Sequence, residues 1–338
     1  YYTGLSLDVA RHFIPIPLLQ RHIQAMSISK FDILHLHLTD SQSFPLLLQD
    51  TNTTIPISNL GKKGSFDRTK IYTVDDMKSL VQYAHQFGIE IIPEIDMPAH
   101  ALSWGKAFSE IIVHCTTIAN RAQTPHNIYP LDPSNHLTYS IIYEVLLQIS
   151  EIFTSKYIHI GGDEVDEQCW NEDKKLMNWT KEHNMTVRDL TGYFEERVVD
   201  IVYKLNRTPI VWQGLIDSNS MPPIPTSSSS GSGRSPWKCW GGLALRAATK
   251  AIHSGHPVIM SACWYLDYNQ EWSSYLATDL TATSRGAVVT SIIQSTQYLH
   301  SNYYNPGGEA SMWTENVDCS NLECRLWPRA GVVAARLW

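Results

Sequence analysis

Two adjacent carboxylic acids, Asp163 and Glu164, are the residues of this sequence best suited to acid–base chemistry. They follow Gly161 and Gly162 at the end of an apolar run. Neighbouring carboxylates repel one another, which raises the pKa of at least one, and a carboxyl group that keeps its proton near neutral pH can act as a general acid. Acidic residues are also favoured in the first turn of a helix. The pair by itself therefore indicates either a catalytic dyad or a strand-to-helix junction.

Aromatic and polar residues that follow other apolar runs favour the catalytic interpretation. Sugars pack their C–H faces on aromatic rings, and their hydroxyls form hydrogen bonds with carboxylates and arginine. Residues of these kinds are Asp8, Arg11, Asp40, Asp96, His100, Trp212, Trp237, Trp240, Trp264, Tyr265, Asp267, Trp313 and Glu315. Together with the carboxylate pair, they predict a carbohydrate site.

Eight short apolar or β-branched runs predict the strands that would carry these residues. The runs cover residues 4–9, 31–38, 89–95, 157–161, 209–212, 237–240, 257–262 and 308–313. Helices are predicted between several of them, at 74–87, 137–154, 187–205 and 243–254. Eight β units with helical crossovers predict a (β/α)₈ TIM barrel, in which the reactive groups lie at the C-terminal ends of the strands. The alternative is an open doubly wound sheet, but no G-x-G-x-x-G follows the first run.

One low-complexity stretch interrupts this pattern. Residues 218–236 are rich in Ser and Pro and lie between predicted strands five and six. Such a segment is more often a surface loop than a functional lid. The barrel is therefore expected to have irregular or missing crossover helices around strands five and six.

Composition excludes several other classes of protein. The chain of 338 residues has 26 Lys and Arg against 33 Asp and Glu, a formal charge of −7 without a basic tract, which argues against nucleic acid or an anionic membrane as partners. No apolar run reaches the roughly 18 residues that a membrane span needs. The six cysteines form no C-x-x-C pair, so a zinc ribbon is not expected. The first residues lack a Met and a signal-like pattern, which favours a processed chain or a fragment.

Seven motifs carry a family resemblance. They cover residues 4–15 (GLSLDVARHFIP), 34–45 (LHLHLTDSQSFP), 92–100 (IPEIDMPAH), 159–165 (HIGGDEV), 264–267 (WYLD), 307–315 (GGEASMWTE) and 325–330 (RLWPRA). In these motifs the chain resembles the catalytic domain of the family 20 glycoside hydrolases, the β-N-acetylhexosaminidases. It departs from the family at Ser41, often Asp there, and at Ala99, usually Gly.

The resemblance implies an exo-acting hydrolase that removes terminal β-linked GlcNAc or GalNAc from oligosaccharides and glycoconjugates with retention of configuration. It implies a lysosomal or secreted location and no cofactor or metal. A homodimer is compatible with the resemblance. Four glycosylation sequons agree with the secretory route but are weak indicators. Residues 1–338 would form a single catalytic barrel domain, without the small N-terminal α/β domain and C-terminal tail that the family commonly carries.

The implied mechanism is substrate-assisted: the acetamido oxygen of the substrate attacks the anomeric carbon and forms an oxazolinium-like intermediate. Glu164 would protonate the leaving oxygen and later deprotonate water. Asp163 would accept the acetamido N–H, and Tyr265 would bond to the acetamido carbonyl oxygen.

The resemblance also assigns residues that would bind or support the sugar. Arg11 would bind the 3- and 4-hydroxyls, while Asp267 and Glu315 would bind the 4- and 6-hydroxyls. Substrate contacts are further expected of Trp212, Trp264, Trp313 and Trp237, the last in preference to Trp240. His100, with Asp96 and Asp40, would hold and tune Glu164. Cys115 and Cys169 match positions that are bridged in animal lysosomal members, and a Cys319–Cys324 pair stays open.

Two other functions compete with this interpretation. His35 and His37 mimic an H-x-H metal site of an amidohydrolase, with Asp40 nearby, but strands five to eight supply Trp, Tyr, Asp and Glu instead of further histidines. A carbohydrate-binding relative without turnover is the second alternative, and the intact Asp163, Glu164 and Tyr265 argue against it. At single residues, Arg11 could instead form a buried ion pair, and His35 and His37 are expected to form hydrogen bonds within the barrel wall.

Overall fold

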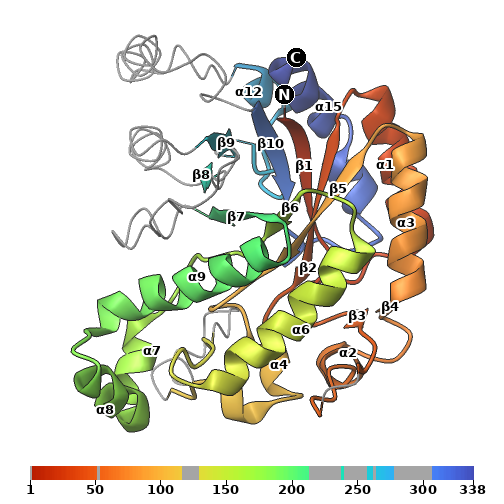
Figure 1. The fold of residues 1–338 in the computed structure, drawn as a ribbon. Helices are drawn as coiled ribbons and strands as arrows, with labels where there is room; N and C mark the ends of the chain where they lie inside the picture. Colours follow the sequence, from red (N-terminus) through yellow and green to blue (C-terminus); the bar gives the residue numbers. More distant parts are fainter. Residues whose placement is uncertain are drawn as a thin grey trace.

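The described residues form a closed barrel of eight parallel strands (Figure 1). The computed structural model describes residues 2–51, 54–115, 129–212, 257–261, 264–277 and 307–338, and the backbone of 237–239. The barrel strands are β1 (Tyr2–Asp8), β2 (Ile33–Thr39), β5 (Glu90–Ile95), β6 (Tyr157–His159), β7 (Thr208–Trp212), β8 (Trp237–Cys239), β9 (Val258–Met260) and β10 (Gly307–Met312). They follow one another around the barrel in chain order, and β10 closes it against β1. The (β/α)₈ prediction is confirmed.

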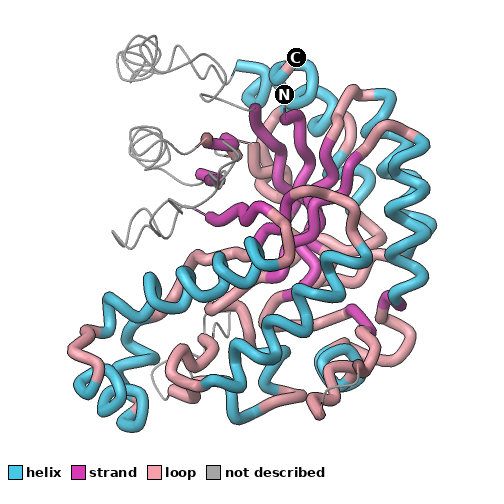
Figure 2. The backbone as a smooth tube through the Cα atoms, viewed as in Figure 1, coloured by secondary structure: helices cyan, strands magenta, loops and turns pink. Residues whose placement is uncertain are grey.

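Helices lie along the outside of strands β1, β5, β7 and β10 (Figure 2). The long ones are α1 (Ile16–Ile28), α3 (Val74–Gln86), α6 (His136–Ile152) and α9 (Val187–Lys204), with α15 (Arg329–Leu337) after the last strand. In this series α1 contacts α3, α3 contacts α6, and α6 contacts α9. No helix of the described residues is both long and apolar enough to cross a membrane.

Helix α3 illustrates why the predicted helices form. Thr73 accepts a hydrogen bond from the backbone N–H of Asp76, and the Asp76 carboxylate accepts one from the backbone N–H of Thr73. This reciprocal capping box satisfies donors that a helix start leaves free. The buried stripe of α3 consists of Val74, Met77, Leu80, Val81 and Ala84. Gly88 follows with φ +71° and ends the helix, as the sequence predicts.

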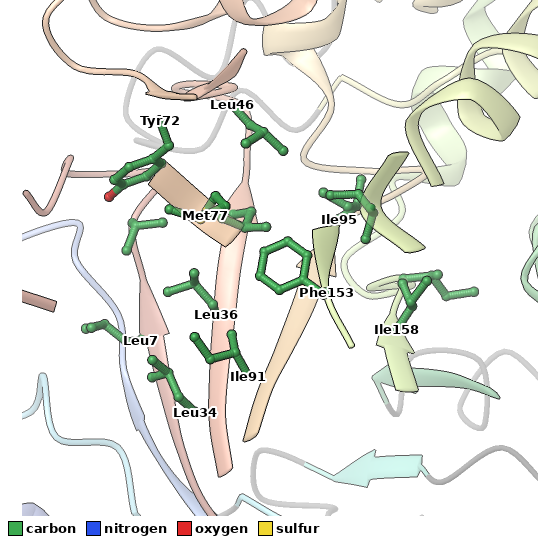
Figure 3. Close-up of a cluster of buried hydrophobic side chains, with 14 of the residues drawn as sticks. Leu7, Leu34, Leu36, Leu46, Tyr72, Met77, Ile91, Ile95, Phe153 and Ile158 are labelled. Carbon is green, nitrogen blue, oxygen red and sulfur yellow. The ribbon is translucent and has the colours of Figure 1, made fainter. Parts of the chain in front are cut away.

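The strands divide their side chains between two layers of the molecule. Leu34 and Leu36 alternate with His35 and His37 along β2, so the two sets point to opposite faces. The leucines belong to the apolar layer between strands and outer helices, with Met77 and Phe153 (Figure 3). The histidines lie inside the barrel, which is therefore polar towards the C-terminal strand ends.

Several short elements in the connections were not predicted. They are β3 (Leu46–Leu47), β4 (Tyr72–Thr73), α2 (Asn59–Gly64), α4 (Leu102–Gly105), a 3₁₀ turn (Ser109–Ile111), α7 (Glu167–Glu172), α8 (Lys174–Glu182), α12 (Trp272–Ala277) and α14 (Leu322–Leu326). Cys115 and Cys169 form a disulfide, whereas Cys319 and Cys324 are free. The expected loop at 218–236, the helix at 243–254 and Trp240 lie outside the described residues, as does the side chain of Trp237.

Candidate active site

The C-terminal strand ends gather the polar residues that the sequence singles out, as expected for a barrel of this kind. The residues come from six places in the chain: Asp8 and Arg11 at β1, Asp40 at β2, Asp96 and His100 after β5, Asp163 and Glu164 after β6, Tyr265 and Asp267 after β9, and Trp313 and Glu315 after β10. Trp212 is the last residue of β7.

A chain of charged contacts connects Arg11 to Glu164. Arg11 Nη2 lies 2.8 Å from Asp40 Oδ2, and its Nη1 lies 3.2 Å from Asp8 Oδ2. Asp40 Oδ1 lies 3.2 Å from His100 Nδ1, whose Nε2 lies 3.2 Å from Glu164 Oε2. Arg11 thus forms the buried ion pairs that the sequence left as an alternative. Its guanidinium also lies 3.7 Å from Glu315 Oε1 and 5.2 Å from the ring centre of Trp313, so it faces the predicted sugar residues as well.

Neighbouring charges shift the pKa values of Asp40 and His100, which lie in the middle of this chain of contacts. Burial opposes ionisation of Asp40, but the charges of Arg11 and His100 hold its pKa well below the usual value. Burial likewise opposes a charge on His100, but Asp40 and Asp96 raise the pKa of the imidazole well above the usual value. The raised pKa favours the protonated imidazole, which can donate from both ring nitrogens, one towards Asp40 and the other towards Glu164.

Asp163 and Asp96, unlike Asp40, have raised pKa values. Burial, with the charge of Glu164, raises the pKa of Asp163 to about 6. Burial and the charge of Asp163 raise the pKa of Asp96 well above its usual value. Within the described part of the chain, Oδ1 of each residue is buried without a hydrogen-bond partner. A buried carboxylate oxygen without a hydrogen bond costs free energy. The Oδ1 atoms of Asp163 and Asp96 are therefore suited to accept one.

The backbone around these carboxylates is constrained. Gly161 has φ +70°, and a Cβ there would lie 1.7 Å from Asp96 Oδ1, so no larger residue fits. His100 and Glu164, which contact each other, have φ values of 55° and 52°. Non-glycine residues in this left-handed region cost energy and cluster at functional sites. The two residues with this strained backbone, His100 and Glu164, are thus the same two whose side chains contact each other.

Glu94 lies in the buried interior of the site. It is fully buried, and its carboxylate accepts a hydrogen bond from the Trp212 indole N–H at 2.6 Å. Its oxygens lie 2.8 Å from His35 Nε2, 2.9 Å from His37 Nδ1 and 3.2 Å from His159 Nδ1. His37 forms the predicted hydrogen bond in the wall, between its Nε2 and Asp40 Oδ2 at 3.0 Å, and His35 lies within ion-pair distance of Glu94. The sequence predicts no role for Glu94, although a lone carboxylate in an apolar strand requires partners and could mark it.

The same groups include the sets that could hold a metal ion. His35, Glu94 and His159 bring one ligand atom each within 4.8 Å of one another, and two similar buried sets consist of His37, Glu94, Asp96 and of Asp40, Asp96, His100. In each set the histidines and carboxylates already interact among themselves. We assign no metal to them.

The aromatic residues take different positions. Trp212 and Trp313 lie 5.9 Å apart between ring centres. Tyr265 is half-buried; its backbone pairs with β10 at Ser311, and burial with the charge of Asp163 raises its pKa. Trp264, by contrast, is fully buried and donates its indole N–H to the Tyr275 carbonyl oxygen at 3.4 Å. The structure places Trp264 in the core instead of beside the other predicted sugar residues, because its ring packs under Gly308.

Asp267 completes the set of carboxylates at the opening. It is half-buried, and burial with the charge of Glu315 raises its pKa to about 6. Its Oδ1 has no hydrogen-bond partner among the described residues. Arg325 donates to its backbone oxygen at 3.0 Å, which holds this segment in place. The opening thus contains a guanidinium and several carboxylates beside indole rings.

Fold and site together define a (β/α)₈ barrel with a carbohydrate-type site of carboxylates and aromatic rings at its C-terminal face. The profile of the glycosyl hydrolase family 20 catalytic domain matches residues 1–338. The chain therefore belongs to glycosyl hydrolase family 20.

Known proteins agree with this assignment. The beta-hexosaminidase subunit beta of Homo sapiens is 32% identical over 345 residues, an alignment that covers 100% of this chain and 56% of that protein. Subunit A1 of the Dictyostelium discoideum enzyme is 31% identical over 349 residues and covered to 59%. The chain thus spans a little over half the length of these relatives. Among solved structures, a Flavobacterium johnsoniae chitobiase has a TM-score of 0.78 at 27% identity, with 100% of this chain and 48% of that chain covered.

Proposed function

We propose that the chain is the catalytic domain of a retaining exo-β-N-acetylhexosaminidase that acts by substrate-assisted catalysis. Its substrates would be oligosaccharides and glycoconjugates that end in β-linked GlcNAc or GalNAc. Two neighbouring groups carry the proposal. They are Asp163, whose buried Oδ1 has no hydrogen-bond partner among the described residues, and the carboxyl group of Glu164, which lies 3.2 Å from His100 Nε2. The family and the beta-hexosaminidase relatives support it.

Asp163 would orient the nucleophile, which is the acetamido oxygen of the substrate. Above a pH of about 6 its carboxylate is ionised and can accept the acetamido N–H. The negative charge then stabilises the positive charge of the oxazolinium-like intermediate. Tyr265 would donate its hydroxyl proton to the acetamido carbonyl oxygen, and its raised pKa keeps that proton in place.

Glu164 would act as general acid and then as general base. Its side chain is 43% exposed, so it can reach both the leaving oxygen and the incoming water. The protonated imidazole of His100 would fix the position of the Glu164 carboxyl group. Asp40, whose own pKa is lowered, would keep His100 charged, and Asp96 lies beside this pair.

The remaining residues would bind the sugar. Arg11, Asp267 and Glu315 offer the donors and acceptors that the 3-, 4- and 6-hydroxyls require. Trp212 and Trp313 would surround the acetamido methyl group, and we propose the same for Trp237. The Cys115–Cys169 disulfide supports a lysosomal or secreted location, because such bonds persist in oxidising compartments.

The proposal is tested with the 4-nitrophenyl glycosides of N-acetyl-β-glucosamine and N-acetyl-β-galactosamine. Glu164→Gln and Asp163→Asn are each expected to lower kcat by roughly 10²- to 10⁴-fold. Glu196→Gln, on the exposed face of α9, is the matched control and should keep full activity. Turnover that survives Glu164→Gln would contradict the mechanism. A folded chain that binds a thiazoline analogue of the intermediate without any turnover would be a carbohydrate-binding protein instead.

A further inference from the structure

Glu94 is a fully buried carboxylate near the end of β5. Nitrogen atoms from three other strands surround it at 2.6 to 3.2 Å: His35 Nε2 and His37 Nδ1 of β2, His159 Nδ1 of β6 and the indole Nε1 of Trp212 at the end of β7. One carboxylate thus joins four neighbouring strands of the barrel. The interior of such a barrel is usually filled by branched apolar side chains, so packing alone does not require this charged cluster.

The first consequence concerns Trp212, which is proposed to contact the acetamido methyl group; this step rests on the proposed function. The Trp212 indole N–H donates to Glu94 Oε1 at 2.6 Å. The histidines around Glu94 lower its pKa despite burial, so the acceptor is an ionised carboxylate, and hydrogen bonds to such acceptors are strong. Because this bond holds one edge of the indole, Glu94 sets the orientation in which Trp212 would meet the acetamido group.

The second consequence concerns the general acid. His37 lies between two carboxylates, with Nδ1 2.9 Å from Glu94 Oε2 and Nε2 3.0 Å from Asp40 Oδ2. Burial opposes a charge on His37, but both carboxylates raise its pKa well above the usual value. From Asp40 the contacts continue to His100 and from His100 to Glu164, each at 3.2 Å. A continuous series of polar contacts therefore leads from Glu94 to Glu164.

We propose that Glu94 is a positioning residue for the hydrolysis. It orients Trp212 against the acetamido group, which supplies the nucleophile. Through His37 and the residues beyond it, Glu94 also orients the Glu164 carboxyl group against the glycosidic oxygen. Nucleophile and acid must be aligned in the same transition state, and a misplacement of about 1 Å can cost 100-fold in rate. Glu94 has no exposed surface with which to touch the substrate, so its effect on the rate is indirect.

Three measurements separate the two routes from a purely structural role. The 4-nitrophenyl glycoside of N-acetyl-β-glucosamine has a good leaving group, whereas the 4-methoxyphenyl glycoside has a poor one and depends more on the general acid. A thiazoline analogue of the intermediate reports the acetamido side, because it binds without a leaving group. A residue that only stabilises the fold would change the denaturation midpoint but none of these values in the folded protein.

Glu94→Gln keeps the size of the side chain and removes its charge. In the folded variant, kcat/KM for the 4-nitrophenyl glycoside is expected to fall about 10- to 100-fold, and that for the 4-methoxyphenyl glycoside at least about 5-fold more. Thiazoline affinity should fall about 10-fold, because the Trp212 N–H loses a charged acceptor. Glu90→Gln, the same substitution four residues earlier on β5, is the matched control and should keep all three values.

His37→Gln provides a second test, because a neutral residue at Glu94 can prevent this buried ion cluster from folding. The variant interrupts the contacts to Asp40 and keeps the bond between Glu94 and Trp212. We expect the ratio of kcat/KM for the 4-nitrophenyl over the 4-methoxyphenyl glycoside to rise at least about 5-fold. Thiazoline affinity should change by less than about 2-fold, since the acetamido side is intact.

The outcomes separate this inference from the proposed function. Unchanged kinetics and thiazoline affinity in a folded Glu94→Gln variant overturn the positioning role and leave the proposed function standing. An unchanged ratio between the two glycosides in His37→Gln also overturns it, because Glu94 then has no route to Glu164. A folded original chain that hydrolyses neither glycoside overturns both proposals.

Discussion

Buried carboxylates at the barrel opening are of two kinds, and the difference has chemical consequences. Asp40 and Glu94 are surrounded by Arg11 or by histidines, which hold their pKa values well below usual despite burial. The lowered pKa values favour the ionised carboxylates, which position their neighbours. Asp96 and Asp163 have raised pKa values and an oxygen without a partner in the described structure. Groups of this second kind gain most from a bound ligand that donates a hydrogen bond.

Glu195 on α9 is a third kind of buried carboxylate, and it permits a prediction about stability. Its side chain is fully buried, and neither oxygen has a hydrogen-bond partner among the described residues. Burial, with the charge of Asp163, raises its pKa well above the usual value. The folded state therefore holds a proton that the unfolded state releases, so stability is greatest below the unfolded pKa of about 4.3 and is lost as the pH rises towards the folded pKa.

Glu195→Gln should remove this pH dependence. We expect the variant to match the original chain near pH 4 and to be more stable at pH 7, by on the order of 1 kcal/mol or more, because a neutral amide has no proton to lose. Chemical denaturation at several pH values measures the difference, with Glu196→Gln as the exposed control on the same helix. Equal stabilisation at both pH values would contradict the assignment of a raised pKa.

Individual site residues were predictable from the sequence where a strand end fixes them. Asp163 and Glu164 follow a buried strand directly, so their place at the barrel opening follows from the fold. Trp264 lies next to Tyr265 in the chain, yet the ring is in the core, because neighbouring residues of an extended segment point in opposite directions. A motif match does not show which of two neighbouring side chains points into the core. The local backbone conformation decides this.

At the scale of elements, the connections between strands hold the catalytic segments in place. The Cys115–Cys169 disulfide links the segment after the 3₁₀ turn to α7, which follows Glu164. Cys169 and Trp170 pack with Val113 in a small apolar cluster apart from the main core. The disulfide thus stabilises a cluster that has few apolar residues of its own.

The double variant Cys115→Ser/Cys169→Ser should be markedly less stable. The two cysteines are 54 residues apart, and loop-closure entropy for that length corresponds to about 4 kcal/mol. Denaturant unfolding under non-reducing conditions gives the value. Cys319→Ser/Cys324→Ser removes two exposed free thiols and should change stability by less than about 0.5 kcal/mol. A double variant at 115 and 169 that unfolds at the same denaturant concentration as the original chain would refute this role.

Long elements were predictable, whereas short ones were not. Helix α3 has a cap at Thr73, a periodic apolar stripe and a glycine stop, and its predicted range agrees with the structure to within one residue. The two-residue strands β3 and β4 have no such pattern, since each exists only because the other pairs with it. Tertiary contacts of this kind are not encoded in local periodicity.

At the scale of the whole molecule, barrel closure joins the two ends of the described chain. Strand β1 pairs with β10 in register from Tyr2–Gly307 to Leu7–Met312, and α15 packs against both strands. The termini consequently lie near each other (Figure 1). Recurrent strand and helix patterns predicted a closed barrel, but they did not predict this register. The register depends on a close approach of the two backbones at Gly307.

Substitution at this junction should therefore destabilise the entire fold. Gly307 has φ +137°, and a Cβ there would lie 1.7 Å from the Tyr2 carbonyl oxygen, so Gly307→Ala must displace one of the two closing strands. We expect a loss of at least about 3 kcal/mol, or no soluble protein, because backbone strain and overpacking add. Gly331→Ala is the matched control: the new methyl group would come no closer than 3.7 Å to Ser29 Oγ, and alanine favours the helix. That variant should be stabilised by up to about 1 kcal/mol. Denaturant unfolding of both variants gives the comparison, and equal stability would mean that closure of the barrel does not depend on this contact.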